Sequence, residues 1–348
     1  MIIKVAINGF GRIGKAALKV AWEKRNMQIA AINNPGDVAT FAHLLKYDSV
    51  YGMWDHEVKG LAAETVVPGK PIGSLVIDGV KVPVWGEKDP LLLPWKRLKV
   101  DVVLECTGRF TKDDAAGAHL KAGAKRVIVS APTKGGTTET FLLGVNAGRY
   151  AGQPLVSNAS CTTNCIAPVM QIMSDAFGVK KAILTTVHAV TAEQNLVDSN
   201  PPALHPDLRR ARSSLANIVP TTTGAASALG SVIPALRGIF DGLALRVPVL
   251  CGSLSDFTFL LKRNTTVAQV NGVFTKAARS ERFQGVLAVT KEPIVSSDII
   301  GRTESAIVDL SLTKVVDGDF VKVLAWYDNE WGYANRLVEM AVKVMGKK

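Results

Sequence analysis

The stretch Gly9-Phe10-Gly11-Arg12-Ile13-Gly14 follows residues 1–8, an apolar run that is predicted to form a strand. Apolar residues then recur at helical spacing, at Ile13, Ala17, Leu18 and Val20–Ala21. A strand, a glycine-rich turn and a helix in this order are typical of a dinucleotide-binding unit, because the glycines let the backbone approach a pyrophosphate at the helix N-terminus. A glycine-rich tight turn without a ligand is the plainer alternative for the same residues.

Strands and helices continue to alternate after this stretch. The pattern predicts strands over 29–33, 100–105 and 125–130, helices over 37–47 and 113–122, and a hairpin over 75–84 on the Asp78-Gly79 turn. Such alternation predicts an α/β protein with a Rossmann-type, doubly wound parallel sheet. Beyond the middle of the chain most predicted strands follow one another, with helices predicted over 225–229 and 267–278 among them, which predicts a second, α+β domain with a mainly antiparallel sheet. These later strands are predicted over 182–191, 243–247, 254–262, 286–289, 306–312 and 321–327.

The composition restricts the protein class. A length of 348 residues suggests two domains. Four cysteines without framework spacing favour a reducing, cytoplasmic location, and Cys161 and Cys165 lack the second ligand pair that zinc would need, so no metal is expected. No membrane-length apolar run and no secretory signal are seen, so no membrane partner is expected. The net charge of +11 is spread along the chain, which favours phosphate-bearing small molecules over nucleic acid.

A second informative stretch is Ser157-Asn158-Ala159-Ser160-Cys161-Thr162-Thr163-Asn164-Cys165. It lies between a short apolar run and a segment with helical spacing, so Cys161 is predicted in the first turn of a helix. There the free backbone N–H groups and the helix dipole favour a thiolate. A small buried core residue is the alternative for this cysteine.

This stretch resembles the active-site signature of the phosphorylating (type I) glyceraldehyde-3-phosphate dehydrogenases, and further similarities run from residue 1 to the C-terminus. The resemblance implies that Cys161 is the nucleophile and that His188, in the strand ending at Thr191, is the general base. The matching cofactor-binding residues are Gly9, Gly11, Arg12, Ile13, Gly14, Asn34, Thr107, Ser130, Asn329 and Tyr333. The matching residues for substrate and inorganic phosphate are Ser160, Thr162, Thr191, Arg209, Thr223, Gly224 and Arg246. Arg246 lies within an apolar run, where an arginine needs an anionic partner.

Two departures from the family pattern concern the cofactor. The family has aspartate at Asn34, which would accept hydrogen bonds from the adenosine ribose and repel a 2′-phosphate. A neutral asparagine therefore predicts dual use of NAD and NADP, leaning toward NADP, with weaker NAD binding as the plainer outcome. The sequence assigns no cation near Asn34 to a 2′-phosphate. The irregular loop 195–207, which contains Ala203-Leu204, is longer than the common form and is also expected near the adenosine.

The resemblance implies reversible, phosphorylating oxidation of glyceraldehyde 3-phosphate to 1,3-bisphosphoglycerate by a cytoplasmic homotetramer, with either glycolytic or gluconeogenic flux. It also implies an NAD(P)-binding domain of residues 1–160 with 329–348, and a catalytic domain of residues 161–328. One alternative is an erythrose-4-phosphate dehydrogenase, a sister group that departs from the pattern at Thr191, Thr223 and Gly224, where this chain keeps it. The other is a non-catalytic RNA-binding or scaffold relative, which the pI of about 9.5 favours and the intact Cys161/His188/Arg246 set opposes.

Overall fold

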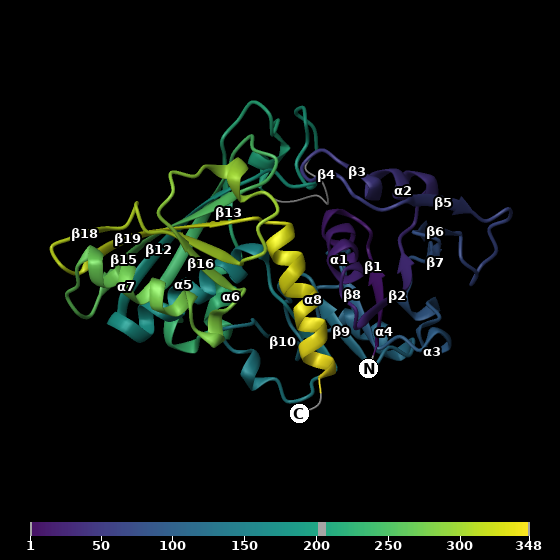
Figure 1. Cartoon of the computed structure of the whole chain (residues 1–348), viewed down its shortest axis with the longest axis horizontal. Coiled ribbons are helices and arrows are strands. Elements are labelled where there is room, and N and C mark those ends of the chain that lie inside the picture. The colour runs from purple at the N-terminus through teal and green to yellow at the C-terminus, as the bar shows by residue number, and fades with distance from the viewer. Residues whose placement is uncertain (1, 201–206, 347–348) are drawn as a thin grey trace. The chain divides into compact units, whose positions relative to one another are not determined.

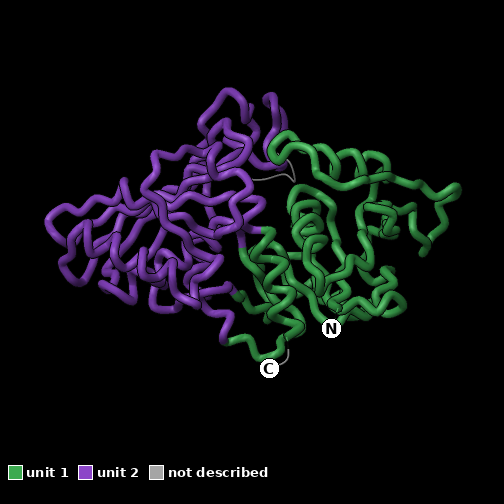
Figure 2. Tube along the Cα trace, viewed as in Figure 1, with its two compact units in different colours: residues 1–141, 149–159, 334–348 green, residues 142–148, 160–333 purple. Residues whose placement is uncertain are grey.

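The computed structural model describes residues 2–200 and 207–346. The chain divides into two compact units, Met1–Phe141 with Arg149–Ala159 and Ala334–Lys348 (unit 1), and Leu142–Gly148 with Ser160–Tyr333 (unit 2) (Figure 2). Compared with the predicted domains, unit 2 also holds Ser160, 142–148 and 329–333. Residues 201–206 of the enlarged loop predicted at 195–207, including Ala203-Leu204, lie outside the described residues.

Unit 1 is built on a sheet of nine strands within its described part, in the order β10-β11-β9-β8-β1-β2-β7-β6-β5 (Figure 1). The strands from β10 to β7 pair in parallel, and the β7-β6-β5 edge is antiparallel, which confirms the predicted parallel sheet and the hairpin. The strands are β1 (Ile3–Asn8), β2 (Met27–Asn33), β5 (Val58–Ala62), β6 (Gly73–Ile77), β7 (Val80–Trp85), β8 (Val102–Glu105), β9 (Arg126–Val129), β10 (Glu139–Thr140) and β11 (Leu155–Ser157).

The central strands of this sheet are buried along almost their whole length, as parallel strands covered on both faces are. Their connections carry helices α1 (Arg12–Trp22), α2 (Val38–Lys46), α3 (Trp95–Leu98) and α4 (Ala118–Lys121), and a small hairpin of β3 (Tyr47–Asp48) and β4 (Gly52–Met53). Helix α2 begins at Asp37, whose carboxylate accepts a hydrogen bond from the Thr40 N–H at 2.7 Å. The result is a β-α alternation whose loops meet at the carboxyl ends of the parallel strands.

Unit 2 is built on a sheet of eight strands within its described part, in the order β13-β14-β12-β15-β19-β17-β16, with β18 paired to β19. Most pairs are antiparallel, as predicted, but β12 pairs with β14, and β16 with β17, in parallel. The strands are β12 (Val179–His188), β13 (Val219–Thr222), β14 (Phe240–Arg246), β15 (Ser253–Leu261), β16 (Leu287–Thr290), β17 (Ala306–Asp309), β18 (Lys314–Val316) and β19 (Phe320–Tyr327).

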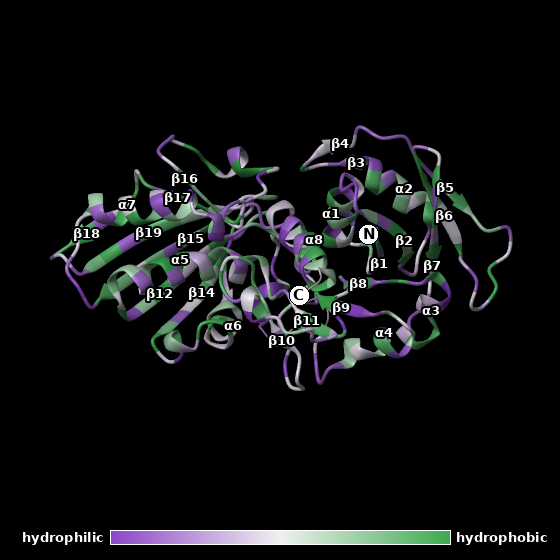
Figure 3. Cartoon of the chain, turned by 60° about the horizontal axis from the view of Figure 1, so that its bottom comes forward, coloured by the Kyte–Doolittle hydropathy of each residue, from purple (hydrophilic) through white to green (hydrophobic). Residues whose placement is uncertain are grey.

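Buried and less buried residues alternate along β15 and β19, so one face of this sheet is packed. Figure 3 shows the hydrophobic residues along these strands in green. Helices α5 (Cys161–Phe177), α6 (Ala225–Val232) and α7 (Val267–Ala278) pack against the sheet, and α5 contacts both of the others. Helix α8 (Trp331–Met345) begins in unit 2 and continues into unit 1. Among the described residues no helix is both long enough and apolar enough to cross a membrane.

Candidate active site

Cys161 is the first residue of α5, as predicted from the sequence. The hydroxyl of Ser160 caps this helix by accepting a hydrogen bond from the Thr163 N–H at 3.1 Å. Ala159, just before the cap, is fully buried and has a φ of 53°, a left-handed conformation that is strained for a residue with a Cβ. A tight, strained turn therefore places Cys161 at the helix N-terminus.

The thiol of Cys161 lies beside the imidazole of His188, with 3.5 Å between Sγ and Nε2. His188 is the last residue of β12 and is 4% exposed. Its Nδ1 lies 2.7 Å from the carbonyl oxygen of Ala189, which accepts a hydrogen bond, and 2.8 Å from the Arg246 guanidinium, which donates one. In the tautomer with the proton on Nδ1, the lone pair of Nε2 faces the sulfur, which is the arrangement a general base for this thiol requires.

Burial sets the resting charges of this pair. Desolvation raises the pKa of Cys161, although the positive charge of Arg246 and hydrogen bonds from Thr162 oppose the rise. The expected preference for a thiolate is therefore outweighed by the loss of water around the sulfur. Desolvation, and next Arg246, lower the pKa of His188 to about 3. The resting site holds a neutral thiol beside a neutral imidazole, so the thiol proton has an acceptor when sulfur attacks a carbonyl.

Arg246 lies beside His188 because the two residues are partners in the parallel pairing of β12 and β14. The Arg246 side chain is 13% exposed and donates from Nη1 to the Ala189 carbonyl at 3.2 Å. A few residues further along the chain, the hydroxyl of Thr191 is buried and has no hydrogen-bond partner among the described residues. A buried guanidinium and an unsatisfied hydroxyl in one neighbourhood are suited to an anion such as phosphate.

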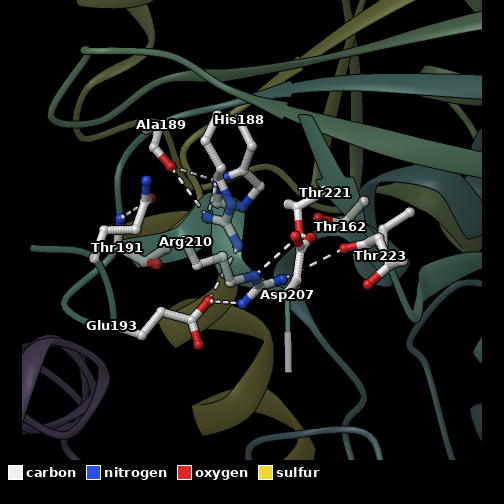
Figure 4. A network of polar contacts seen from close by, with 12 residues as sticks. Thr162, His188, Ala189, Thr191, Glu193, Asp207, Arg210, Thr221 and Thr223 are labelled. Atoms are coloured by element: carbon white, nitrogen blue, oxygen red, sulfur yellow. Dashed lines mark hydrogen bonds and ion pairs between the residues drawn. The ribbon is translucent and has the colours of Figure 1, made fainter. Parts of the chain in front are cut away.

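Arg209, predicted as a phosphate ligand, is exposed in the structure, and its assignment stays a prediction. Arg209 is 59% exposed, and its Nε and Nη2 bind the Asp207 carboxylate at 2.8 and 3.1 Å. The next residue, Arg210, turns inward instead: its side chain is 11% exposed, and its Nε donates to the Thr221 hydroxyl at 3.0 Å (Figure 4). The two residues lie in a single 3₁₀ turn, Leu208–Ala211, where successive side chains point in different directions.

The remaining predicted phosphate residues lie at two helix N-termini of unit 2. Thr223 and Gly224 precede α6, and the Thr223 hydroxyl accepts a hydrogen bond from the Ala225 N–H at 3.2 Å. The hydroxyl of Thr162 is directed to the buried Tyr327 hydroxyl, 3.0 Å away, so its side chain serves the core as well as Cys161. Of the predicted nicotinamide residues in unit 2, Tyr333 is buried, and the Asn329 Oδ1 accepts hydrogen bonds from the Gly252 N–H and the Ser253 hydroxyl.

In unit 1 the three glycines of the first stretch have different roles. Gly9 has a φ of +93°, and a Cβ there would lie 2.6 Å from the Thr107 nitrogen. A Cβ on Gly14 would lie 2.0 Å from the Gly9 carbonyl oxygen. Close packing of strand and helix therefore requires both residues to be glycine. Gly11, the N-cap of α1, has nothing within 4 Å of its Cβ position, so open space adjoins a helix N-terminus without a side-chain cap. That cradle fits a pyrophosphate.

The other cofactor residues predicted in unit 1 follow the ends of parallel strands: Asn34 after β2, Thr107 after β8 and Ser130 after β9. The Oδ1 of Asn34 accepts a hydrogen bond from the Phe10 N–H at 3.0 Å, and its Nδ2 donates to the Pro35 carbonyl at 3.0 Å. A cavity of about 360 Å³ is lined by Gly9, Gly11, Asn34 and Thr107 and also by three charged residues, the cations Lys88 and Arg109 and the acid Glu87. These residues fit an adenosine with or without a 2′-phosphate.

Arg12 and Ile13 begin helix α1, next to the open space at Gly11. The Arg12 guanidinium binds the Asp48 carboxylate at 2.5 Å and lies 5.7 Å from the centroid of the Tyr51 ring. These contacts hold the start of α1 against the β3–β4 hairpin. Among the described residues, no group of three or more histidine, cysteine or acidic side chains is placed to hold a metal ion.

Comparison with known proteins decides the family. Residues 3–113 match the family model described as the glyceraldehyde 3-phosphate dehydrogenase NAD binding domain, and residues 160–329 match the C-terminal domain of the same family. The chain belongs to the glyceraldehyde 3-phosphate dehydrogenase family. Similar relatives named as this dehydrogenase come from Thermotoga maritima (48% identical over 339 residues, 97% of each chain) and Streptomyces coelicolor (46% over 347 residues, 99% of each). A chloroplastic relative from Gracilaria gracilis is 47% identical over 345 residues, 98% of this chain and 79% of its own.

The sequence did not identify several charged residues that the structure places beside the predicted site residues of this dehydrogenase. Arg210 carried a signal, because it is one of three arginines in a run, but the sequence did not show which one turns inward. Lys88 and Arg109 follow different strands, so only the folded sheet brings them to the cavity with Asn34. Glu193 had no signal at all: it reads as an ordinary loop acid, yet its carboxylate contacts both Arg210 and Arg246.

Proposed function

We propose that the protein catalyses the reversible, phosphorylating oxidation of glyceraldehyde 3-phosphate to 1,3-bisphosphoglycerate. The observation that carries the proposal is the 3.5 Å contact between the Cys161 sulfur and Nε2 of His188, with Arg246 in the same unit and a buried Thr191 hydroxyl that has no hydrogen-bond partner among the described residues. A nucleophile, its base and an anion site are the parts that covalent oxidation of a phosphorylated aldehyde needs. The similarity to relatives named for this activity supports the same reaction.

In the proposed reaction the Cys161 sulfur bonds to the aldehyde carbon while its proton passes to His188 Nε2. The nicotinamide cofactor, when bound, supplies the acceptor for the hydrogen that the carbon loses on oxidation. The carbon is then held on Cys161 as a thioester, which keeps the free energy of oxidation from being lost to hydrolysis. An oxygen of inorganic phosphate bonds to the thioester carbon, the C–S bond breaks so that the acyl phosphate is released, and the departing Cys161 thiolate recovers the proton from His188. Arg246 with Thr191 holds the substrate phosphate, and Arg210 with Ser160, Thr223 and Gly224 holds the attacking phosphate.

The test is the formation of reduced cofactor from glyceraldehyde 3-phosphate with and without inorganic phosphate, with Cys161→Ser as the control. We expect sustained turnover only with phosphate and only in the native enzyme. Faster turnover of erythrose 4-phosphate, without a need for phosphate, would favour the sister dehydrogenase instead. Absence of turnover on both aldehydes, with RNA retained on a filter, would favour the non-catalytic relative.

For the cofactor, we propose dual use of NAD and NADP, leaning toward NADP. Asn34 has no charge to repel a 2′-phosphate, and Lys88 and Arg109 line the same cavity and can pair with it. We propose that unit 1 binds this dinucleotide and that unit 2 carries the covalent chemistry. The comparison is kcat/KM for the two cofactors, and a native preference for NAD of several hundred-fold would contradict dual use.

The assembly proposed from the family resemblance is a homotetramer. Ile183, Leu243 and Phe320 are 59%, 44% and 49% exposed, and strand register places them on one face of the unit 2 sheet. Exposed apolar groups on one face are a surface that another copy would bury. Light scattering measures the mass directly, and a monomer at micromolar concentration would overturn this assembly. A cytoplasmic location and the direction of flux stay predictions.

A further inference from the structure

One carboxylate, that of Glu193, contacts two largely buried arginines of unit 2, Arg210 and Arg246. Its Oε1 lies 2.7 Å from Arg210 Nη1 and 3.4 Å from Arg246 Nη2. Figure 4 shows Glu193 and Arg210 directed toward one another. The glutamate is 49% exposed, whereas the arginines are 11% and 13% exposed, so the carboxylate is the partner that solvent and solutes reach most easily. Glu193 therefore occupies the position from which an anion would bind either guanidinium.

The backbone holds Glu193 close to these arginines. Gln194 N–H donates to the Thr191 carbonyl at 2.9 Å, and the Thr191 N–H donates to the Gln194 side-chain oxygen at 3.2 Å. These two bonds close a turn from Thr191 to Gln194, and Glu193 lies inside it. The turn also begins at Thr191, whose buried hydroxyl has no hydrogen-bond partner in the described part of the chain. The carboxylate is thus tethered at high effective concentration beside the predicted phosphate positions.

We propose that Glu193 is a tethered competitor that sets the affinity and the selectivity of both phosphate positions. An entering anion must replace its charge-assisted contact with an arginine. A dianionic phosphate with three acceptor oxygens can do so, whereas a monoanion such as chloride or acetate offers no more charge than the carboxylate it displaces. Glu193 thereby excludes common cellular monoanions and weakens the hold on phosphorylated products, which favours their release.

This inference rests on the proposed function only for the identity of the anions, so the first measurement uses inorganic phosphate alone. Isothermal titration of the full-length protein, without aldehyde, compares the native chain with Glu193→Gln. We expect phosphate to bind the variant about tenfold more tightly, since a neutral amide competes for a guanidinium less well than a carboxylate. Chloride and acetate, which should not compete with phosphate in the native protein, should compete in the variant.

The matched control is Asp198→Asn, which removes an acid of similar exposure (56% against 49%) from the same loop, paired with Arg212 at 2.6 Å. It should leave phosphate binding unchanged. An equal gain in Asp198→Asn would show that general loop charge is responsible, and unchanged or weaker phosphate binding in Glu193→Gln would overturn the proposal. Glu193→Asp, which shortens the tether, should give a smaller gain and serves if the glutamine variant is unstable. In turnover, the KM for the phosphorylated aldehyde should fall in Glu193→Gln while that for unphosphorylated glyceraldehyde stays the same.

Discussion

Replacing Arg210 by alanine should raise the KM for inorganic phosphate strongly, whereas the same change at the neighbouring Arg209 should not. Arg210 is only 11% exposed and bonds to Thr221 of β13, two residues before Thr223, which precedes α6. Arg209 is exposed and occupied by Asp207. Both variants lose one guanidinium, at adjacent positions, so a difference in their KM for phosphate reflects the geometry of the site and not the net charge.

The size of the effect follows from the contact that is lost. A hydrogen bond to a charged partner contributes about 1.5–3 kcal/mol, which is about 10- to 150-fold in KM. Loss of Arg210 also leaves the Glu193 carboxylate without its 2.7 Å partner and facing the site, so the effect should lie toward the upper end of that range. For Arg209, which has an exposed ion pair, we expect less than about threefold.

The assay is steady-state reduction of the cofactor at saturating glyceraldehyde 3-phosphate, with inorganic phosphate varied. The melting temperature of each variant is measured alongside, so that a loss of fold is recognised. A KM for phosphate that rises equally in both variants, or only in Arg209→Ala, would refute the assignment of Arg210 to the attacking phosphate.

Three further predictions follow from the same geometry. Arg246→Ala should raise the KM for glyceraldehyde 3-phosphate by about 10- to 150-fold relative to unphosphorylated glyceraldehyde, and an equal loss on both would make Arg246 structural. Asn34→Asp should shift the ratio of kcat/KM toward NAD, because a carboxylate repels the 2′-phosphate; an unchanged ratio would assign the choice to other residues. The pKa of His188 is about 3 in the folded protein and about 6.5 in the unfolded chain. As the pH falls below about 6.5, the unfolded chain therefore takes up a proton before the folded protein does, and the free energy of unfolding decreases. Urea unfolding at pH 7 and 4.5 should therefore show a smaller loss of stability in His188→Gln than in the native enzyme, and equal losses would contradict the shift.

Local patterns were sufficient to predict much of the fold. The glycine spacing after β1 predicted the parallel dinucleotide fold, because Gly9 and Gly14 are required by strand–helix packing that the motif itself specifies. Asp78 and Gly79, both with positive φ, predicted the β6–β7 hairpin. The parallel pairing of β12 with β14 was not predicted, because it joins strands separated by a long stretch of chain, and nothing local specifies such a partner.

Some features of the candidate site depend on the local sequence, and others depend on how the rest of the chain folds. Cys161 at the start of α5 is a local feature, and the sequence predicted its position. Its raised pKa was not predicted, because burial depends on what the rest of unit 2 packs around the sulfur. Arg210 turns inward, and Arg209 does not, because of their different positions in a short 3₁₀ turn, which the sequence pattern does not specify. The contact of Glu193 with Arg246 depends on the path of a loop.

The central claim is that Cys161 carries the acyl group between oxidation and attack by phosphate. Its most direct test is a stopped-flow record of reduced cofactor formed from glyceraldehyde 3-phosphate in the absence of phosphate. We expect a rapid burst of about one equivalent per Cys161, then near arrest, then sustained turnover when phosphate is added. Mass spectrometry of the arrested enzyme should find the acyl group on the peptide that contains Cys161. Continuous turnover without phosphate and without a burst, or a full burst in Cys161→Ser, would contradict the account.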